Sequence, residues 1–256
     1  MISQSSPSAR RRTGDNLFEP LVPQPAYGRV AAAIEQKILQ RSLRVGDRLP
    51  TETELARQFG VNRSTVREAV RRLESAGLVG RAPGSKRLCV TRPGQADTAS
   101  RVSRALVLDE VTFIELWEAM LAIAPRTAAL AAAHGSVADH ARLEQCIRDV
   151  ELARGAEAAV SGVVAYFGTL AVASRNRVLM LAMQPVTRLL APSLRRMIDR
   201  VPQGRSRILV AQRCILEALR KASTAEAESW MTRHVQDFRR GYEIAGIALD
   251  SRAAGG

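Results

Sequence analysis

The sequence predicts a mainly α-helical protein with two units: a small N-terminal unit of three helices and a β-hairpin, and a longer all-helical bundle. Two observations favour this fold class. Apolar residues recur at three- and four-residue steps over most of the chain, whereas strand-like segments are confined to residues 78–90. The 256 residues, of which 46% are hydrophobic and 25% charged, suffice for two modest globular domains.

Changes in composition mark the domain boundaries. The first 25 residues are rich in Ser, Pro and Arg without helical periodicity, so a disordered basic arm containing Arg10–Arg12 is expected there. Short apolar runs alternate with turn residues after this arm, and the chain beyond Thr98 is rich in Ala, Leu and Val. The predicted parts are a disordered arm (1–25), a first folded unit (26–92), a linker (93–97), a helical unit (98–247) and a flexible tail (248–256).

The first unit has the start and stop signals of three consecutive helices. An amphipathic helix is expected from Tyr27 onward. Thr51-Glu52-Thr53-Glu54 then has the form of a capping box, in which the Thr51 hydroxyl accepts from the backbone N–H of Glu54 and Glu54 reaches back. Gly60 supplies the positive φ of a tight turn, and Asn62 is expected to cap the next helix. Helix, tight turn and helix predict a helix-turn-helix.

The third predicted helix has an apolar inner face of Val66, Ala69, Val70 and Leu73, and Gly77 is placed to end it. Its polar side chains lie opposite this apolar stripe. Arg63, Ser64, Arg67 and Arg71 are expected on this outer face, the first three in the opening turns, where such helices meet base edges in the major groove. Arginine can read O6 and N7 of guanine with two hydrogen bonds. Thr65 and the free backbone N–H groups at the helix start suit phosphates.

A basic β-wing is expected after this helix. Leu78-Val79 and Leu88-Cys89-Val90 have the composition of short strands around a basic tip. Each arginine alone is better explained as part of a solvated helix face, but the turn, the cap, the basic face and the wing together predict a winged helix-turn-helix. The predicted nucleic-acid contacts are Thr51, Asn62, Arg63, Ser64, Thr65, Arg67, Arg71, Gly84, Lys86 and Arg87.

The charge of the chain favours polyanionic partners. The sequence holds 38 Lys and Arg residues against 25 Asp and Glu, a net charge of +13, and residues 1–97 carry 17 of the basic and 9 of the acidic residues. Double-stranded DNA is therefore the expected partner of the first unit, where the excess is densest. Two alternative functions would require the basic charge alone. The chain could be an architectural protein that binds DNA without sequence preference, or a protein that binds an anionic membrane surface.

Other functional classes find less support. Three scattered cysteines (Cys89, Cys146 and Cys214) indicate a reducing cytosol rather than a disulfide framework, and the polar N-terminus lacks the apolar core of a signal peptide. The uncharged run from Ala158 to Ser174 fits a buried helix better than a membrane span, so no membrane partner is expected. The sequence contains no P-loop, HExxH, GxSxG or dinucleotide fingerprint, and an enzyme is therefore not expected.

From about Tyr27 to Val90, the chain resembles the GntR family of bacterial transcription regulators. The matching motifs are Gly46-Asp47-Arg48-Leu49-Pro50-Thr51-Glu52, Glu54-Leu55-Ala56, Gly60-Val61-Asn62-Arg63-Ser64-Thr65-Val66-Arg67-Glu68-Ala69 and Leu73-Glu74-Ser75-Ala76-Gly77-Leu78-Val79. The resemblance implies that Arg63 and Arg67 contact operator bases and that Thr65 touches phosphate. The family often has arginine at the position of Thr53, so it implies one base contact fewer here.

The helical unit is similar to the FadR-type ligand-binding (FCD) domain of one GntR subfamily. The similarity rests on Glu115-Leu116, Ala128-Ala129, Ala173-Ser174-Arg175-Asn176, Ile215-Leu216-Glu217-Ala218-Leu219, and Met231 with His234. Many members hold a divalent metal with an aspartate and three histidines, whose positions correspond here to Val163, Phe167, Gln212 and His234. One imidazole cannot hold such a metal, so neither a metal nor another cofactor is expected.

Two interpretations of the interior of this unit stay open, an effector pocket and a plain core. The residues concerned are Trp117, Leu121, Val163, Phe167, Gln212 and His234. In a plain core, Gln212 and His234 would hydrogen-bond to each other or to water. In a pocket, this lining would suit a small apolar or lipid-like effector better than a metal-bound acid. The resemblance thus predicts a homodimeric, ligand-responsive repressor that binds a palindromic operator in the bacterial cytosol.

Overall fold

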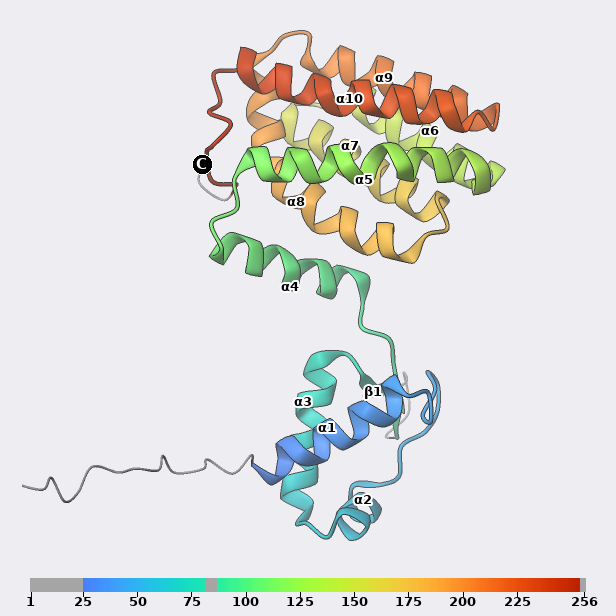
Figure 1. Ribbon diagram of the computed structural model, residues 1–256, viewed down its shortest axis with the longest axis vertical. Coiled ribbons are helices and arrows are strands. Elements are labelled where there is room, and N and C mark those ends of the chain that lie inside the picture. The colour runs from blue at the N-terminus through green and yellow to red at the C-terminus, as the bar shows by residue number, and fades with distance from the viewer. Residues whose placement is uncertain (1–24, 82–86, 254–256) are drawn as a thin grey trace, which may run out of the picture. The chain divides into compact units, whose positions relative to one another are not determined.

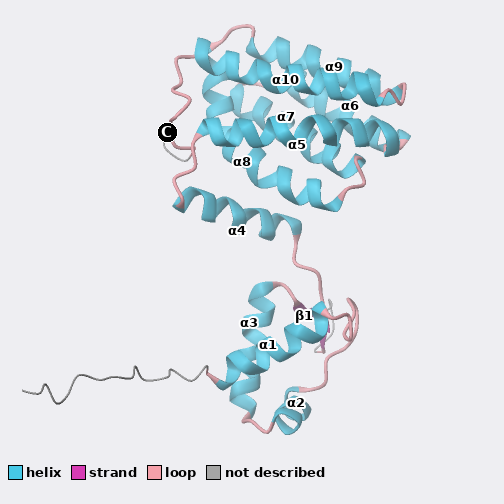
Figure 2. Ribbon diagram, in the orientation of Figure 1, coloured by secondary structure: helices cyan, strands magenta, loops and turns pink. Residues whose placement is uncertain are grey.

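The structure, a computed structural model, describes residues 25–81 and 87–253 (Figure 1). Helices dominate the described chain, and the strands form one short hairpin (Figure 2). The expected arm over residues 1–25 lies outside the described residues, apart from Pro25 at the start of α1. The elements are, in chain order, α1 (Ala26–Leu39), α2 (Glu52–Phe59), α3 (Arg63–Ala76), β1 (Val79–Arg81), β2 (Leu88–Val90), α4 (Gln95–Leu108), α5 (Phe113–His134), α6 (Val137–Leu152), α7 (Ala156–Ala173), α8 (Arg177–Arg200), α9 (Gly204–Arg220) and α10 (Thr224–Ile244).

The chain divides into two compact units between Pro93 and Gly94, each with its own hydrophobic core. The expected linker over residues 93–97 needs correction, because α4 begins at Gln95. The side chain of Asp97 lies in the first turn of this helix, where the helix dipole favours a negative charge. Helix α4 also packs against α8, so most of the expected linker belongs to the second unit.

In the first unit, α1 and α2 both pack against α3. The predicted inner face of α3 is confirmed, since Val66, Ala69, Val70 and Leu73 are all buried. Gly77 ends the helix in a left-handed conformation with φ 75°, as its sequence position predicts. The apolar stripe thus fixes which face of α3 remains in solvent.

The predicted β-wing is confirmed as an antiparallel hairpin in which Val79 pairs with Val90. A further segment, which has no strand pattern in the sequence, pairs with the other edge of β2. The backbone N–H of Leu49 donates to the carbonyl of Leu88 at 2.9 Å, and Arg48 lies opposite the middle residue of β2. This pairing brings the chain that precedes α2 to the base of the wing.

In the second unit, α5 packs extensively on α10, and α7 packs on both α6 and α8 (Figure 1). Helix α7 is long and apolar enough to cross a membrane by length and composition, yet 56% of it is buried inside the bundle. A Cβ atom at Gly162 would lie 2.7 Å from a methyl group of Val150, so glycine permits the close approach of α6 and α7. The predicted buried helix over the uncharged run is therefore confirmed.

The C-terminal residues correct the prediction of a flexible tail over residues 248–256. The backbone N–H of Phe113 donates to the carbonyl of Ser251 (2.9 Å), and that of Ala253 donates to the carbonyl of Val111 (2.8 Å). The prediction is wrong up to Ala253, because this segment supplies a partner for an N–H group that the first turn of α5 cannot satisfy itself. The last three residues lie outside the described part of the chain.

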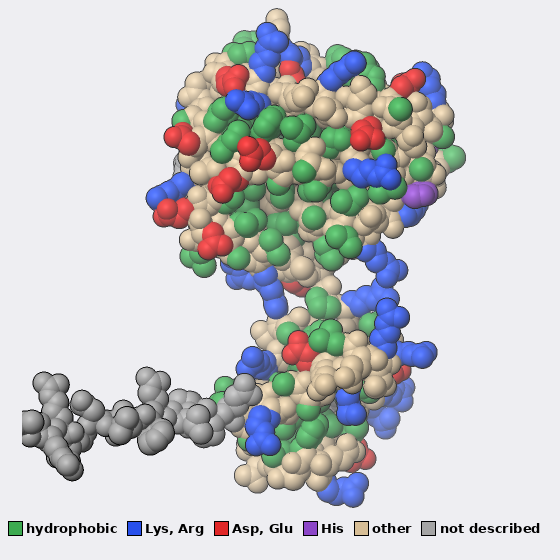
Figure 3. Space-filling view, in the orientation of Figure 1, with side chains coloured by type: hydrophobic (Ala, Val, Ile, Leu, Met, Phe, Trp, Pro, Cys, Tyr) green, Lys and Arg blue, Asp and Glu red, His purple; other side chains and the backbone are tan. Residues whose placement is uncertain are grey.

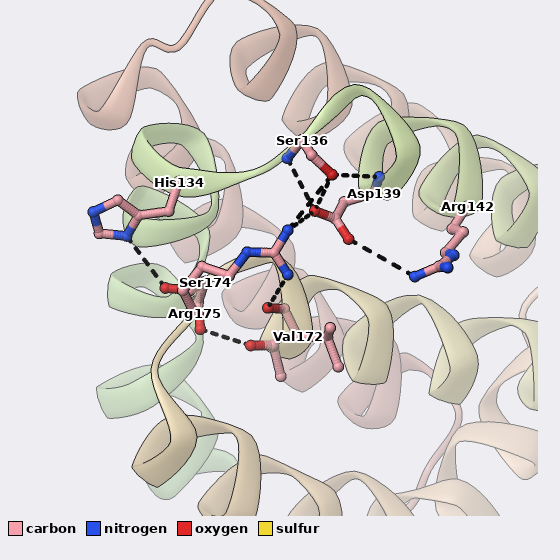
Figure 4. A network of polar contacts seen from close by, with 8 residues as sticks. His134, Ser136, Asp139, Arg142, Val172, Ser174 and Arg175 are labelled. Carbon is pink, nitrogen blue, oxygen red and sulfur yellow. Dashed lines mark hydrogen bonds and ion pairs between the residues drawn. The ribbon is translucent and has the colours of Figure 1, made fainter.

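A buried carboxylate joins the α5–α6 and α7–α8 connections (Figure 4). Asp139 accepts hydrogen bonds from the backbone N–H and the hydroxyl of Ser136 at 2.9 and 2.6 Å, and the guanidinium of Arg175 contacts the same oxygen. Burial by itself would raise the pKa of Asp139, but the hydrogen bonds from Ser136 and the charges of Arg175 and Arg142 lower it below its ordinary value. The carboxylate therefore stabilises two helix connections at once.

Candidate functional site

The helix-turn-helix of the first unit begins with the predicted capping box. The Thr51 hydroxyl accepts from the backbone N–H of Glu54 (3.3 Å), and the Glu54 carboxylate accepts from the backbone N–H of Thr51 (2.7 Å). The backbone and side-chain hydrogen bonds from Thr51 lower the pKa of Glu54. Thr51, a predicted nucleic-acid contact, is exposed, but its hydroxyl is engaged in this cap.

The turn between α2 and α3 follows the predicted glycine geometry. Gly60 has φ 66° and ψ 34°, and the backbone N–H groups of Gly60 and Val61 both donate to the carbonyl of Ala56. Asn62 precedes α3 in an extended conformation, but its side chain makes no capping hydrogen bond. The prediction of an Asn62 side-chain cap is therefore wrong, and the first backbone N–H groups of α3 keep no side-chain partner at this position.

The outer face of α3 presents the predicted row of polar side chains. Arg63, Ser64, Arg67 and Arg71 are exposed, whereas Thr65 is half-buried. Arg63, Arg67 and Arg71 lie at four-residue steps and Ser64 lies three residues before Arg67, so these four share the face that is opposite the buried stripe. The structure therefore brings five of the predicted nucleic-acid contacts together on one helix.

Two arginines of this row have acidic neighbours. The Nε atom of Arg67 lies 3.5 Å from Glu52, and a terminal nitrogen of Arg71 lies 2.7 Å from Glu68. Ion pairs at the surface contribute little to stability, since water screens them. Both arginines can therefore exchange these partners for a nucleic acid.

The base of the wing adds two arginines that are not among the predicted nucleic-acid contacts. Arg48 and Arg81 line a groove of about 420 Å³, together with Arg63, Arg87 and residues 51–54. Both are exposed, one beside β2 and the other at the end of β1. Alternation within the strand could have indicated Arg81, but Arg48 reaches the groove only through a pairing between distant segments.

The remaining wing contacts are only partly described. Arg87 is exposed and lines the groove, whereas Gly84 and Lys86 lie outside the described residues. On the visible face of this unit, Lys and Arg side chains lie at several places among hydrophobic and other groups, and Asp and Glu side chains are fewer (Figure 3). A surface of guanidinium groups and open helix N–H groups can bind phosphate oxygens and the acceptor edges of bases.

In the bundle, the predicted effector residues lie in different places. Trp117, Val163 and Phe167 line an interior apolar cavity of about 20 Å³ with side chains of α8 and α10. This volume has room for about one water molecule. Leu121 is half-buried against the core outside this cavity, and His234 lines a pocket of about 310 Å³ formed by α9 and α10.

Gln212 and His234 are buried without the hydrogen bonds expected of a plain core. Both polar side-chain atoms of Gln212, and Nε2 of His234, have no hydrogen-bond partner among the described residues. The two side chains therefore do not bond to each other, and the alternative, that they bond to water, stays a prediction. The His234 ring lies 5.8 Å from that of Phe167 and 4.6 Å from that of Phe238, measured between centroids. Burial lowers the pKa of His234 to about 4, so its imidazole is neutral at pH 7.

Comparison with known proteins identifies the family. The family model for "Bacterial regulatory proteins, gntR family" matches residues 26–86, and the FCD domain model matches residues 115–237. The uncharacterized HTH-type transcriptional regulator Rv0494 of Mycobacterium tuberculosis is 34% identical over 166 residues, which cover 64% of this chain and 68% of that protein. The chain belongs to the GntR family.

Two further proteins resemble this GntR-family member. The histidine utilization repressor of Klebsiella aerogenes is 39% identical over 74 residues, which cover 29% of this chain and 31% of that protein. The solved structure of Streptococcus agalactiae GntR shares 27% identity and superposes with a TM-score of 0.57, covering 84% of this chain and 99% of that chain. The GntR-family protein is accordingly a DNA-binding transcription regulator with an N-terminal helix-turn-helix domain and a helical FCD domain.

Proposed function

We propose that this GntR-family protein acts as a homodimer that recognises a palindromic operator and represses transcription in the bacterial cytosol. The observation that carries the proposal is the exposure of Arg63 and Arg67 on the outer face of α3, opposite a buried apolar stripe. Two guanidinium groups about one helical turn apart can reach neighbouring base edges in a major groove. Base contacts of this kind supply sequence discrimination.

Phosphate contacts would hold α3 in register. Arg48, Arg81 and Arg87 lie at the groove beside the start of α3, where the backbone of a bound duplex would pass. Thr65 and the open backbone N–H groups of the first turn add donors for the same oxygens. We therefore assign the reading of bases to α3 and the positioning of the duplex to the wing base.

Two-fold symmetry accounts for the operator and the oligomeric state. A recognition helix covers one half-site, and a homodimer places two such helices about one turn of DNA apart. Repression is supported by the similarity of the N-terminal region to the histidine utilization repressor. No catalytic activity is proposed, because the N-terminal family model describes regulatory proteins.

Genomic footprinting followed by competition at fixed salt tests this function. The recovered site, carried on a labelled fragment, is competed with itself and with random DNA of equal length. A sequence-specific regulator is expected to prefer its own site by a factor of about 10³ or more. Equal competition by random DNA would instead support the architectural alternative, in which only the phosphate backbone is bound.

We further propose that the bundle takes a small apolar or lipid-like effector. The interior cavity is lined by Trp117, Val163, Phe167 and other apolar side chains, which suit such a molecule. At about 20 Å³ the cavity is too small for any effector, so binding must select a more open packing of the helices. A molecule that favours one packing of the bundle can thereby change the spacing of two operator-binding domains.

The effector is proposed to bind without a metal. The positions that hold a metal in many FCD domains carry Val163, Phe167, Gln212 and His234, so one imidazole stands where three or four ligands are needed. Within the described residues, no three His, Cys, Asp or Glu side chains form a group that could hold a metal ion.

Two measurements on purified protein test the effector proposal. Elemental analysis is expected to find no stoichiometric Zn, Mn or Ni, and one metal per chain would overturn the metal-free pocket. Mass spectrometry of small molecules released by denaturing the protein is expected to identify an apolar compound. Recovery of a polar acid alone would contradict the proposed ligand class.

A further inference from the structure

We propose that the bundle has a second binding site, for a small organic anion, in a surface groove between α7 and α8. The groove has a volume of about 320 Å³. It shares no lining residue with the interior cavity and is therefore a separate site. Its lining includes Arg188, Arg195 and Arg196 from α8, with Pro192 between them, and Glu157 and Val160 from α7.

The sequence places the three arginines on one face of α8. Arg195 and Arg196 follow Arg188 by seven and eight residues, which corresponds to two helical turns. Side chains at such spacings lie above one another along a helix. The three guanidinium groups therefore converge on the same groove instead of being spread around the helix.

Within residues 25–81 and 87–253, two of these arginines have no acidic partner. Among the described residues, no carboxylate lies within 4.0 Å of Arg188 or Arg196. Arg188 donates to the hydroxyl of Ser100 on α4 at 2.9 Å, and Arg196 reaches the hydroxyl of Ser193 only at 3.4 Å. Among the residues that the structure describes, none accepts a hydrogen bond from the Nε atom of Arg196, which is buried. An anionic oxygen in the groove could form charge-assisted hydrogen bonds with the terminal nitrogens of Arg188 and Arg196, whose present acceptors are neutral.

The third arginine is held by an exchangeable partner. Arg195 lies 3.0 Å from Glu157, and these side chains are 57% and 77% exposed. An ion pair this exposed is weak, so an anion with better geometry can replace the carboxylate of Glu157. Three arginines and one glutamate leave a local charge of +2, which attracts anions and disfavours metal cations.

The remaining surface of the groove sets the size and chemistry of the ligand. Val160, Ala191 and Pro192 supply an apolar wall beside the guanidinium groups. The volume is at the lower end of the range of pockets that take small molecules. The site therefore suits a compact molecule whose carboxylate or phosphate group faces the arginines and whose carbon skeleton contacts this wall.

Isothermal titration of the full chain with citrate, and separately with inorganic phosphate, tests the site at an ionic strength held constant with NaCl. Binding of at least one probe with a Kd below about 1 mM is expected, and the preferred probe identifies a carboxylate or a phosphate ligand. Arg196→Gln should weaken binding by at least about tenfold, because a charge-assisted hydrogen bond is lost. Glu157→Gln should tighten binding about two- to fivefold, because the competing carboxylate is removed.

The pair formed by Arg213 and Glu151 provides matched controls. It lies outside the groove, and its side chains are 52% and 47% exposed. Arg213→Gln and Glu151→Gln change the net charge equally and should leave the Kd unchanged. If the Arg196→Gln variant has a lowered Tm, the variants at exposed positions test the site instead. In that case Arg195→Gln must weaken anion binding and Glu157→Gln must tighten it. The proposed site would be overturned if neither probe bound, or if the control variants changed the Kd as much as the groove variants. Neither outcome would affect the proposal of operator recognition.

Discussion

The two units of the molecule use polar side chains in opposite ways. In the helix-turn-helix unit, the arginines of α3 lie in solvent and the buried face of the helix is purely apolar. In the bundle, Gln212 and His234 lie inside the core, and polar atoms of both have no partner among the described residues. The arginines of the first unit keep their hydration. Burial of Gln212 and His234 costs desolvation free energy that no hydrogen bond among the described residues offsets for these atoms.

This difference bears on how each unit meets a ligand. An exposed guanidinium on a rigid helix needs no rearrangement of the protein core to reach a base. An interior cavity of about 20 Å³ admits nothing larger than a water molecule until the helices move. Recognition of DNA is therefore built into the folded state of the first unit, and any response to an effector must come from repacking the second.

The largest expected effect concerns the exposed arginines. A variant with both Arg63→Ala and Arg67→Ala should lose operator affinity by a factor of roughly 30 or more, since each base-reading arginine is worth about 1–3 kcal/mol. The Tm should stay within about 2 °C of the parent, because neither side chain is part of the core.

Arg72→Ala is the matched control on the same helix, because its guanidinium lies beside α1 near Gly28. It removes the same charge and should cost far less specific affinity in a gel-shift or fluorescence-anisotropy titration. If both variants weakened binding to random DNA and to the operator equally, α3 would not be the base-reading element.

The buried histidine predicts acid sensitivity of the bundle. Burial lowers the pKa of His234 to about 4 in the folded state, whereas the ordinary value for an exposed histidine is 6.5. Between these values the unfolded chain binds a proton that the folded chain does not, so stability falls as the pH drops from 6.5 towards 4. The loss amounts to roughly 3 kcal/mol over this window.

Urea titrations at pH 7, 6 and 5 measure the larger part of this loss, and His234→Phe should remove most of what they measure. The buried carboxylate of Asp139 does not interfere at these values, because its pKa lies below its ordinary value of 3.8. An unchanged slope in the variant would show that other groups cause the acid sensitivity.

The buried carboxylate of Asp139, which has its partners, should behave differently from the buried polar groups of Gln212 and His234. Asp139→Ala removes the acceptor shared by Ser136 and Arg175, and should lower the free energy of unfolding by about 1–3 kcal/mol. Asp139→Asn keeps an acceptor for Ser136 but loses the charge, so it should cost less. Denaturant unfolding of both variants at pH 7 tests this order, and an equal or reversed order would contradict the role of the hydrogen bonds from Ser136.

The smallest expected effect is a gain in the free energy of unfolding. Gln212→Leu replaces an unsatisfied buried amide by an apolar side chain of similar size, and should raise the free energy of unfolding by about 1 kcal/mol. A loss of stability would mean that the amide has a partner in solution, such as a water molecule or a bound effector. Comparison of Tm values before and after removal of co-purifying small molecules distinguishes these two partners.

Much of the first unit could be predicted because its signals are local. The capping box at Thr51, the glycine turn at Gly60 and the end of α3 at Gly77 each depend on residues within one or two turns of the chain. The periodicity of α3 likewise determines which side chains are buried and which are exposed. These features place Arg63 and Arg67 on the outer face without knowledge of any distant contact.

Tertiary packing decided the features that join distant residues. Arg48 reaches the wing because its segment pairs with β2, and the chain up to Ala253 is held by its pairing with the start of α5. Gln212 and His234 lie on buried faces, yet polar atoms of both have no partner in the part of the chain that the structure describes. Periodicity indicates that a side chain is buried but not which atoms surround it, because those atoms come from other helices. The amino-acid order therefore determines the helices and the exposed arginines, whereas helix packing determines the size of the cavity and the neighbours of its polar groups.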